Sequence, residues 1–334
     1  MTRQIDIIDD YTDRRRWNAF VAASPFGHFF QTWEWGELQE GLDASPRRVA
    51  ALAGDDVAGV VQVLIFDTGT RKFAYVPRGP VADPEDDEVS GALVEAALLV
   101  SLAQGADFVR IEPQWEYTDA RAERMDQAGF TRAKQFIMPR RTILVDLSPP
   151  EETIWNRFRS NTRNRIRLAE KLGVGIRVGT EADVETFIRL SEDTAARQGM
   201  RRADPRQYTR AWTYFGARDA MRLYLAHAEG EDLSGLMVFI CGPNATYLWG
   251  GSSSAPNARK FNPNQLLHWA AMRWARERGC ATYDLHGIPD HDLDVLEAEY
   301  SRQTGGMWNL YRFKRGFGGI AYRHLGTFDR VFTR

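Results

Sequence analysis

The chain contains two copies of one pattern of turn, strands and helix. The first copy opens with the turn GDDVAG at residues 54–59, and the second with GEDLSG at residues 230–235, 176 positions later. An apolar run typical of a buried strand follows each turn, at Val60–Phe66 and at Leu236–Cys241. Because such strands must be covered by other elements, a repeat of this length predicts a duplicated domain.

The order of elements after the turn is the same in both copies: strand, strand, helix, strand. Each helix has apolar residues at helical spacing and stops before a glycine, as a C-terminal cap would. The second strand, helix and third strand are expected at 73–80, 89–104 and 107–112 in the first copy, and at 246–252, 264–278 and 281–286 in the second. This order predicts two α/β (or α+β) domains, each a mixed sheet flanked by helices; a chance likeness of two αβ units is the alternative.

A helix-start signature marks the junction between the copies. Ser148 is a suitable N-cap, Pro150 suits the first turn, and Glu151 stands at the third position. We therefore expect the first domain at residues 1–147 and the second at 148–319.

Composition restricts the possible surroundings and partners. The net charge is −2, so a polyanionic partner would need a local basic patch. Cys241 and Cys280 lie far apart in sequence and form neither a disulfide framework nor a zinc motif. Residues 1–20 do not resemble a signal peptide, and the best apolar stretch, Ala92–Ala103, is shorter than the roughly 20 residues needed to span a bilayer. We expect a cytoplasmic protein, at most peripheral to the inner face of the membrane.

The segment from residue 151 to residue 172 is expected to form one basic amphipathic helix. Apolar positions fall on one arc of the helical wheel, and cations occupy the opposite one. The cations are Arg157, Arg159, Arg163, Arg167 and Lys171, and the apolar arc holds Ile154, Phe158, Thr162, Ile166, Ala169 and Leu172. Further basic clusters lie at 197–210 and 302–334. This pattern is typical of a site for phosphates or RNA; a solvated face is the alternative.

Several catalytic motifs are absent from the sequence. It has no GxxxxGK[ST] loop, no GxSxG elbow and no HExxH, and His286 and His291 have no nearby cysteine. Glu112, which ends a strand before a proline, is a candidate carboxylate, or else an exposed or ion-paired residue. A duplicated αβ unit without a nucleophile favours a transferase in which one bound substrate attacks the other. Residues 257–264, NARKFNPN, lack the glycines of a coenzyme A loop, so acyl-CoA is a less favoured donor.

Five segments, taken in order, resemble the FemAB/FemX family of non-ribosomal peptidyltransferases. They are FQTWEWG at 30–36, YVPRGP at 75–80, RIEP at 110–113, YDLHGI at 283–288 and YRFK at 311–314. The resemblance runs from about residue 15 to the C-terminus. It implies two tandem acetyltransferase-like (GNAT-like) domains, no coiled-coil arm, and a tail at 320–334 that returns to the first domain. It also implies transfer of an amino acid from aminoacyl-tRNA to the side-chain amine of a peptidoglycan stem peptide.

The resemblance assigns catalytic roles to three residues. Phe313 and Lys314 match the family's Phe-Lys pair, whose lysine lies where the ester carbonyl is expected and would stabilise the developing oxyanion. Glu112 occupies the position of an aspartate proposed to accept the proton of the attacking amine. We expect Leu310–Phe313 to form a strand, with Arg312 on the same face as Lys314 and one pleat back.

The resemblance also suggests residues that bind substrates. Arg202 and Tyr208 lie where the family holds the nucleotide diphosphate of a muramyl-peptide precursor, and Trp249 stands in a tyrosine position on the same wall. Gln39 replaces a phosphate-binding lysine of a relative. The remaining candidates are Arg78 and Tyr247 for the precursor, and Arg159, Arg163, Arg167 and Lys171 as a track for tRNA phosphates.

The sequence therefore predicts a monomeric aminoacyl-tRNA-dependent aminoacyltransferase that needs no metal and no cofactor. Its expected partners are aminoacyl-tRNA and a UDP-linked muramyl-peptide or lipid-linked peptidoglycan precursor. An acyl-CoA-dependent N-acyltransferase and a non-catalytic RNA-binding protein are the alternatives. The amino acid transferred and the form of the acceptor stay open.

Overall fold

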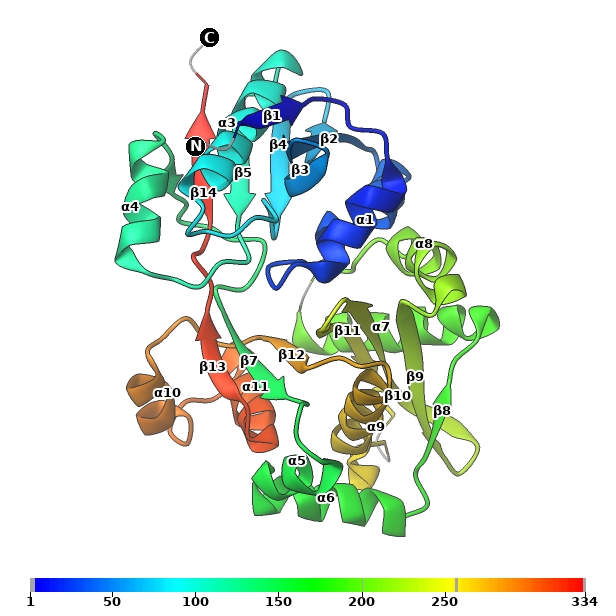
Figure 1. Ribbon diagram of the computed structural model, residues 1–334. Helices are drawn as coiled ribbons and strands as arrows, with labels where there is room; N and C mark the ends of the chain where they lie inside the picture. Colours follow the sequence, from blue (N-terminus) through cyan, green and yellow to red (C-terminus); the bar gives the residue numbers. More distant parts are fainter. Residues whose placement is uncertain (1–3, 200, 256–257, 333–334) are drawn as a thin grey trace. The chain divides into compact units, whose positions relative to one another are not determined.

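The computed structural model describes residues 4–199, 201–255 and 258–332. The chain divides into two units, Met1–Arg140 with Arg323–Arg334, and Arg141–Tyr322 (Figure 1). The division precedes the expected boundary at residue 147, because the strand at Arg141–Asp146 belongs to the sheet of the second unit.

Unit 1 is built on a seven-stranded sheet in the order β1-β2-β3-β4-β5-β14-β6. Neighbouring strands run antiparallel except β4 and β5, which are parallel and are joined by helix α3. The strands are β1 (Ile5–Ile8), β2 (Ala44–Ala53), β3 (Asp56–Asp67), β4 (Lys72–Pro77), β5 (Phe108–Glu112), β6 (Thr131–Arg132) and β14 (Phe328–Val331), and the helices α1 (Arg14–Ala23), α2 (Trp33–Glu40), α3 (Asp87–Ala103) and α4 (Asp119–Gln127). Strand β3 contacts both α1 and α3, and its run of buried residues follows from its central place.

Unit 2 repeats this plan with the order β13-β7-β12-β11-β10-β9-β8. Strands β11 and β12 run parallel and are joined by helix α9, as β4 and β5 are joined by α3 in unit 1. The strands are β7 (Arg141–Asp146), β8 (Gly175–Val178), β9 (Met221–Ala228), β10 (Glu231–Cys241), β11 (Asn244–Ser252), β12 (Thr282–Gly287) and β13 (Ile320–Arg323). The helices are α5 (Glu151–Arg157), α6 (Ser160–Lys171), α7 (Val184–Gln198), α8 (Arg206–Tyr214), α9 (Pro263–Glu277), α10 (Leu293–Glu299) and α11 (Gly306–Lys314).

The predicted duplication is confirmed, because β3-β4-α3-β5 in unit 1 corresponds to β10-β11-α9-β12 in unit 2. The glycines predicted to stop the two equivalent helices, Gly105 and Gly279, have φ angles of 71° and 83°. That left-handed conformation is the one that favours glycine after a helix. At the start of α5, Pro150 rather than the predicted Ser148 occupies the N-cap position.

The two sheets exchange one strand each. Strand β7 follows β6 in sequence but lies in the sheet of unit 2, and β14 follows β13 but lies in the sheet of unit 1. Unit 1 receives β14, from the end of the chain, between β5 and β6, whereas unit 2 receives β7, which precedes its other strands in sequence, between β12 and β13. The tail was expected to join the first domain from residue 320, but residues 320–322 belong to unit 2, since β13 pairs with β7. The chain passes between the units twice, at Arg140–Arg141 and at Tyr322–Arg323.

The expected single helix at 151–172 is wrong, because α5 and α6 are separate. Phe158 and Arg159 between them have extended backbone, with ψ angles of 140° and 148°. The buried ring of Phe158 packs against Trp269 and Phe317, at centroid distances of 5.1 and 5.2 Å, and the Arg159 N–H donates to the Gly316 carbonyl. The helix is therefore interrupted at this point: backbone hydrogen bonds of the helix are lost, and the Phe158 ring gains aromatic contacts.

The strand predicted at Leu310–Phe313 is also wrong, since these residues belong to α11. The buried residues Tyr311 and Lys314 are three positions apart, which is helical spacing. Arg312, expected on the same face as Lys314, is exposed and donates to the carbonyls of Tyr300 and Gln303. After α11, Gly316 lies in a short 3-10 helix (Arg315–Phe317), and Gly318 and Gly319 connect this helix to β13.

Within the ranges that the structure describes, no helix is both long enough and apolar enough to cross a membrane.

Candidate active site

Lys314 is a buried cation at the last residue of α11. Only 4% of its surface is exposed, and its Nζ donates a hydrogen bond of 2.7 Å to the carbonyl of Gly287 at the end of β12. The Tyr247 ring lies 5.9 Å from Nζ. Burial lowers the pKa of Lys314 to about 7, while the charge of Asp284 acts to raise it. The side chain thus changes its charge near neutral pH, in surroundings where a charge acts strongly.

A neutral aromatic cluster surrounds this lysine in unit 2. His268 on α9 is buried, and its Nδ1 forms a 3.1 Å hydrogen bond with the hydroxyl of Tyr283. The His268 ring also contacts Tyr247 and Phe313, at centroid distances of 4.6 and 5.4 Å. Burial, together with the nearby Lys314 charge, lowers the pKa of His268 to about 3. The imidazole is therefore uncharged at neutral pH.

A cavity of about 140 Å³ adjoins the aromatic cluster. Tyr247, His268 and Phe313 form part of its wall, and Thr194, Gln198 and Ser252 supply polar groups. With His268 neutral, its lining side chains carry no formal charge. A small uncharged polar group would fit such a space better than an ion, because a buried ion needs a partner of opposite charge.

Glu112 is held in unit 1 by donors from several segments. Its carboxylate, 1% exposed, accepts hydrogen bonds from the hydroxyls of Tyr75 and Thr327, at 2.5 and 2.6 Å, and from the backbone N–H groups of Ile137 and Met138, at 2.9 and 3.1 Å. A carboxylate saturated in this way is poorly placed to accept a proton from a substrate. Its geometry is that of a structural anchor for the tail and for the segment before β7.

A second cavity, of about 260 Å³, lies in unit 1. Half of its lining residues are aromatic, and half-buried Gln39 on α2 contributes a polar group. The aromatic residues of its lining are Phe30, Trp35, Phe66, Phe73 and Tyr75. Arg78 is buried in the turn after β4 and donates to the Pro139 carbonyl at 3.0 Å.

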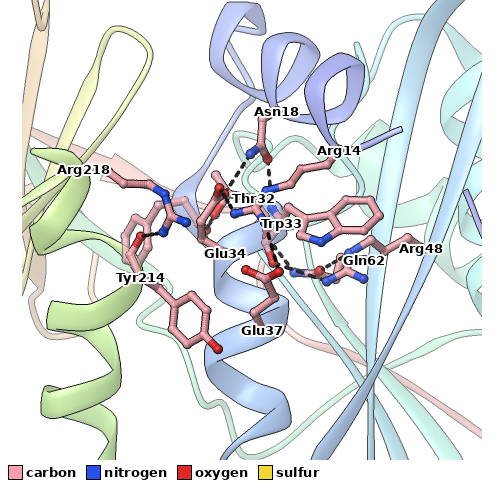
Figure 2. A network of polar contacts seen from close by, with 11 residues as sticks. Arg14, Asn18, Thr32, Trp33, Glu34, Glu37, Arg48, Gln62, Tyr214 and Arg218 are labelled. Atoms are coloured by element: carbon pink, nitrogen blue, oxygen red, sulfur yellow. Dashed lines mark hydrogen bonds and ion pairs between the residues drawn. The ribbon is translucent and has the colours of Figure 1, made fainter. Parts of the chain in front are cut away.

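A polar network, shown in Figure 2, fixes helix α2 and the residues before it. Arg14 donates to Glu34 and Glu37 at 2.6 and 3.1 Å, and the Arg48 guanidinium lies 3.8 Å from the centroid of the Trp33 ring. Burial opposes ionisation of Glu34, but hydrogen bonds led by that from Arg14 hold its pKa below the usual value. The network also includes Asn18, bonded to Glu34 and Trp33, and Gln62, bonded to Arg48 and to the carbonyls of Phe30 and Thr32. It gives α2, which carries Trp35 and Gln39, a rigid base.

Of the four residues expected at the precursor in the second domain, the structure brings Tyr208 and Trp249 together, whereas Tyr247 lies against His268 near Lys314. Tyr208 on α8 is buried, bonds to Ser191 at 2.8 Å, and meets Trp249 edge to face at 5.1 Å. Arg202 is 67% exposed and pairs with Glu192 at 3.5 Å. We find Arg202 at the surface rather than in the aromatic contact.

The four cations expected to bind tRNA differ in their surroundings. Arg159 pairs with Glu297 at 3.4 Å, and Arg163 donates to the carbonyls of Asn156 and Phe158 at the break between α5 and α6. Arg167 and Lys171 on α6 are exposed, with Arg167 lying over the Trp155 ring at 5.5 Å. These last two are the better placed to meet a phosphate backbone.

The residues that sequence reasoning missed surround Lys314. His268 has no role in the expectations above, and Asp284 and Gly287 were noted only within a matching segment. An acid between Tyr283 and Leu285, inside a predicted strand, was the available signal for Asp284. Nothing comparable singled out His268.

Comparison with known proteins agrees with this architecture. Residues 156–300, which include Tyr247, His268 and Asp284, match the Acetyltransferase (GNAT) domain model. The chain is 25% identical to a Lipid II:glycine glycyltransferase of Staphylococcus aureus, over 95% of this chain and 91% of that protein. The crystal structure of FemX superposes with a TM-score of 0.84 at 22% identity and covers 97% of both chains. The resemblance to the FemAB/FemX family is confirmed.

The FemX-like fold also relates the chain to proteins with two GNAT domains. A tandem GNAT protein from the clavulanic acid biosynthesis pathway superposes with a TM-score of 0.57 at 12% identity, over 98% of each chain. The tandem acetyltransferase-like architecture expected from the sequence is confirmed. Lys314 lies beyond the residues that match the GNAT model, in the helix that follows them.

Proposed function

We propose that the chain is an aminoacyltransferase that moves an amino acid from aminoacyl-tRNA to the side-chain amine of a peptidoglycan precursor. The observation that carries this proposal is the buried Lys314 beside a neutral cavity, in a chain that aligns over 95% of its length with a Lipid II:glycine glycyltransferase. The aminoacyl group, with its α-amine uncharged, is proposed to enter that cavity.

In the proposed reaction the neutral amine attacks the ester carbonyl directly. A C–N bond forms, the carbonyl oxygen becomes an oxyanion, and the ester C–O bond then breaks to release the ribose hydroxyl, with the amine proton lost to solvent or to that hydroxyl. The Lys314 ammonium would stabilise the oxyanion. Its position is fixed by the bond to Gly287, so little reorganisation is needed as the charge develops.

The acceptor is proposed to bind the aromatic cavity of unit 1. Gln39 and Tyr75 at its wall would contact the polar and apolar parts of the precursor, respectively. Glu112, beneath Tyr75, is proposed to shape this cavity rather than to remove a proton.

A pool of charged tRNAs and a UDP-linked muramyl-pentapeptide precursor provide the direct test. Mass spectrometry should show the acceptor gaining the mass of one or more aminoacyl residues, and RNase treatment of the tRNA should abolish the gain. Transfer from acetyl-CoA that survives RNase would instead favour the N-acyltransferase alternative. Binding of RNA without transfer to either soluble or lipid-linked acceptors would favour the RNA-binding alternative.

Reversal of two exposed cations tests the tRNA contact. The double variant Arg167→Glu, Lys171→Glu should bind tRNA at least about tenfold more weakly at low salt, and the slope of log affinity against log salt should fall by about 1.5, since two phosphate contacts are lost. Filter binding across a salt series measures both quantities. Arg189→Glu, an exposed arginine on α7, is the matched control. Unchanged affinity of the double variant at low salt would remove α6 from the tRNA site.

A further inference from the structure

Asp284 is a buried acid on β12, and the role given to it here rests on the proposed function of Lys314. We propose that Asp284 is a positioning residue: its carboxylate holds the backbone turn whose Gly287 carbonyl binds Lys314, and its negative charge balances the buried ammonium. Asp284 acts through Lys314 and is not proposed to touch the substrate.

The carboxylate of Asp284 ties together two strands and a bulge. Asp284 is 7% exposed, and its Oδ1 accepts hydrogen bonds from the backbone N–H of His286, at 2.6 Å, and from the hydroxyl of Thr142 on β7. The register between β12 and β7 shifts between Asp284, opposite Leu144, and Gly287, opposite Thr142. One side chain therefore fixes the irregular end of β12 both along the strand and across the sheet.

This irregular backbone needs support from outside. His286 has a φ angle of 63°, a left-handed conformation that is strained for a residue with a Cβ and persists only where neighbouring groups impose it. The bond from His286 N–H to Asp284 is one such restraint here. The next residue, Gly287, then presents its carbonyl to Nζ of Lys314 at 2.7 Å. Loss of the carboxylate would let this turn relax and remove the acceptor.

The charge of Asp284 is not duplicated by the other groups that face Lys314. Lys314 faces the uncharged ring of Tyr247, on β11, and the neutral imidazole of His268, on α9. Arg315, which follows Lys314 in the chain, donates a hydrogen bond of 2.9 Å to Glu297. Burial lowers the pKa of Lys314, and Asp284 is the charge that opposes this effect.

NMR can follow the ionisation of Lys314 directly. The chain has only five lysines, so ¹³Cε-lysine signals can be assigned by substituting each in turn. In Asp284→Asn the pKa of Lys314 should fall by about one unit or more, because an unbalanced buried ammonium loses its proton more readily. Asp146→Asn, which removes an exposed acid from the adjacent strand β7, should leave this pKa unchanged. An unchanged pKa of Lys314 in Asp284→Asn would overturn the proposal.

Transfer assays on the same variants separate this inference from the proposed function. At pH 8 Asp284→Asn should be roughly tenfold slower for each unit by which the pKa falls, and it should recover part of that loss at lower pH. Thr142→Val keeps the charge and removes one hydrogen bond, so it should slow transfer without the shift in pH profile. A lowered pKa with unchanged transfer would support the role of Asp284 and contradict that of Lys314 in the reaction.

A stability measurement covers the case in which Asp284→Asn does not fold. If the Asp284 carboxylate balances the buried Lys314 ammonium, removing that ammonium should rescue Asp284→Asn, because a buried pair is destabilised most when only one partner is lost. The double variant Asp284→Asn, Lys314→Met should therefore fold, and it should unfold at a higher urea concentration than Asp284→Asn alone. A double variant that is no more stable than Asp284→Asn would overturn the proposal.

Discussion

Lys314→Met is expected to slow aminoacyl transfer by a factor of about 10²–10³, the usual loss on removal of one oxyanion-stabilising group. The effect should fall on kcat, with little change in KM for the charged tRNA, because the oxyanion exists only at and near the transition state. Single-turnover assays with excess enzyme would measure the chemical step. Methionine resembles lysine in length and fits the same buried path, so folding should survive.

The pH profile gives this prediction a second signature. The pKa of Lys314 lies near 7, so the native chain should lose the ammonium, and with it part of kcat, as the pH rises through that value. Lys314→Met should lack this alkaline decline. Lys72→Met, at a surface ion pair with Asp67, is the matched control and should behave as the native chain. Equal rates for Lys314→Met and the native chain would exclude the proposed role.

Glu112→Gln is expected to destabilise unit 1 by about 2–3 kcal/mol, because an amide accepts through one oxygen only and its NH₂ group would face a buried backbone N–H. The hydroxyls of Tyr75 and Thr327 can turn to accept from the amide, but the N–H groups of Ile137 and Met138 can only donate. Urea unfolding followed by circular dichroism would report the loss.

The same variant distinguishes an anchor from a general base. At a temperature where Glu112→Gln remains folded, transfer should stay within a few-fold of the native rate. Glu116→Gln changes an exposed glutamate four residues further on and should affect neither stability nor rate. A stable Glu112→Gln protein that has lost activity would restore Glu112 as the base.

The sequence was most informative where each copy supports the other. The turn and strand beginning at Gly54 recur at Gly230, and the helix-ending glycines 105 and 279 recur in the same relation. Recurrence adds long-range information to a local pattern, and for this reason the duplicated sheet and its crossover helix could be predicted.

Local patterns misled where tertiary contacts decide the backbone. Residues 310–313 read as a strand although they lie in α11, and the helical period continues across the break at Phe158. Phe158 leaves the helix to pack among rings from residues 269 and 317, which no window of sequence contains.

In the candidate site, too, residue identities could be predicted from the sequence, whereas their surroundings depend on tertiary contacts. The family resemblance marked Lys314, but its burial and its acceptor Gly287 depend on the fold. The resemblance also marked Glu112 as a base, whereas its donors come from residues 75, 137, 138 and 327, far from it in the chain. Roles that depend on such distant partners could not be read from residue type and spacing.

The strand exchange has a consequence for synthesis on the ribosome. Unit 2 has all its strands once Arg323 has been made, whereas unit 1 must wait for Phe328–Val331 before β14 can join β5 to β6. At usual elongation rates of roughly 5–20 residues per second, β5 keeps an unpaired edge for about 10–40 s while the second unit is translated. The half of the protein that emerges first is therefore the last to be completed, and a chaperone that shields β5 would act on unit 1 during that interval.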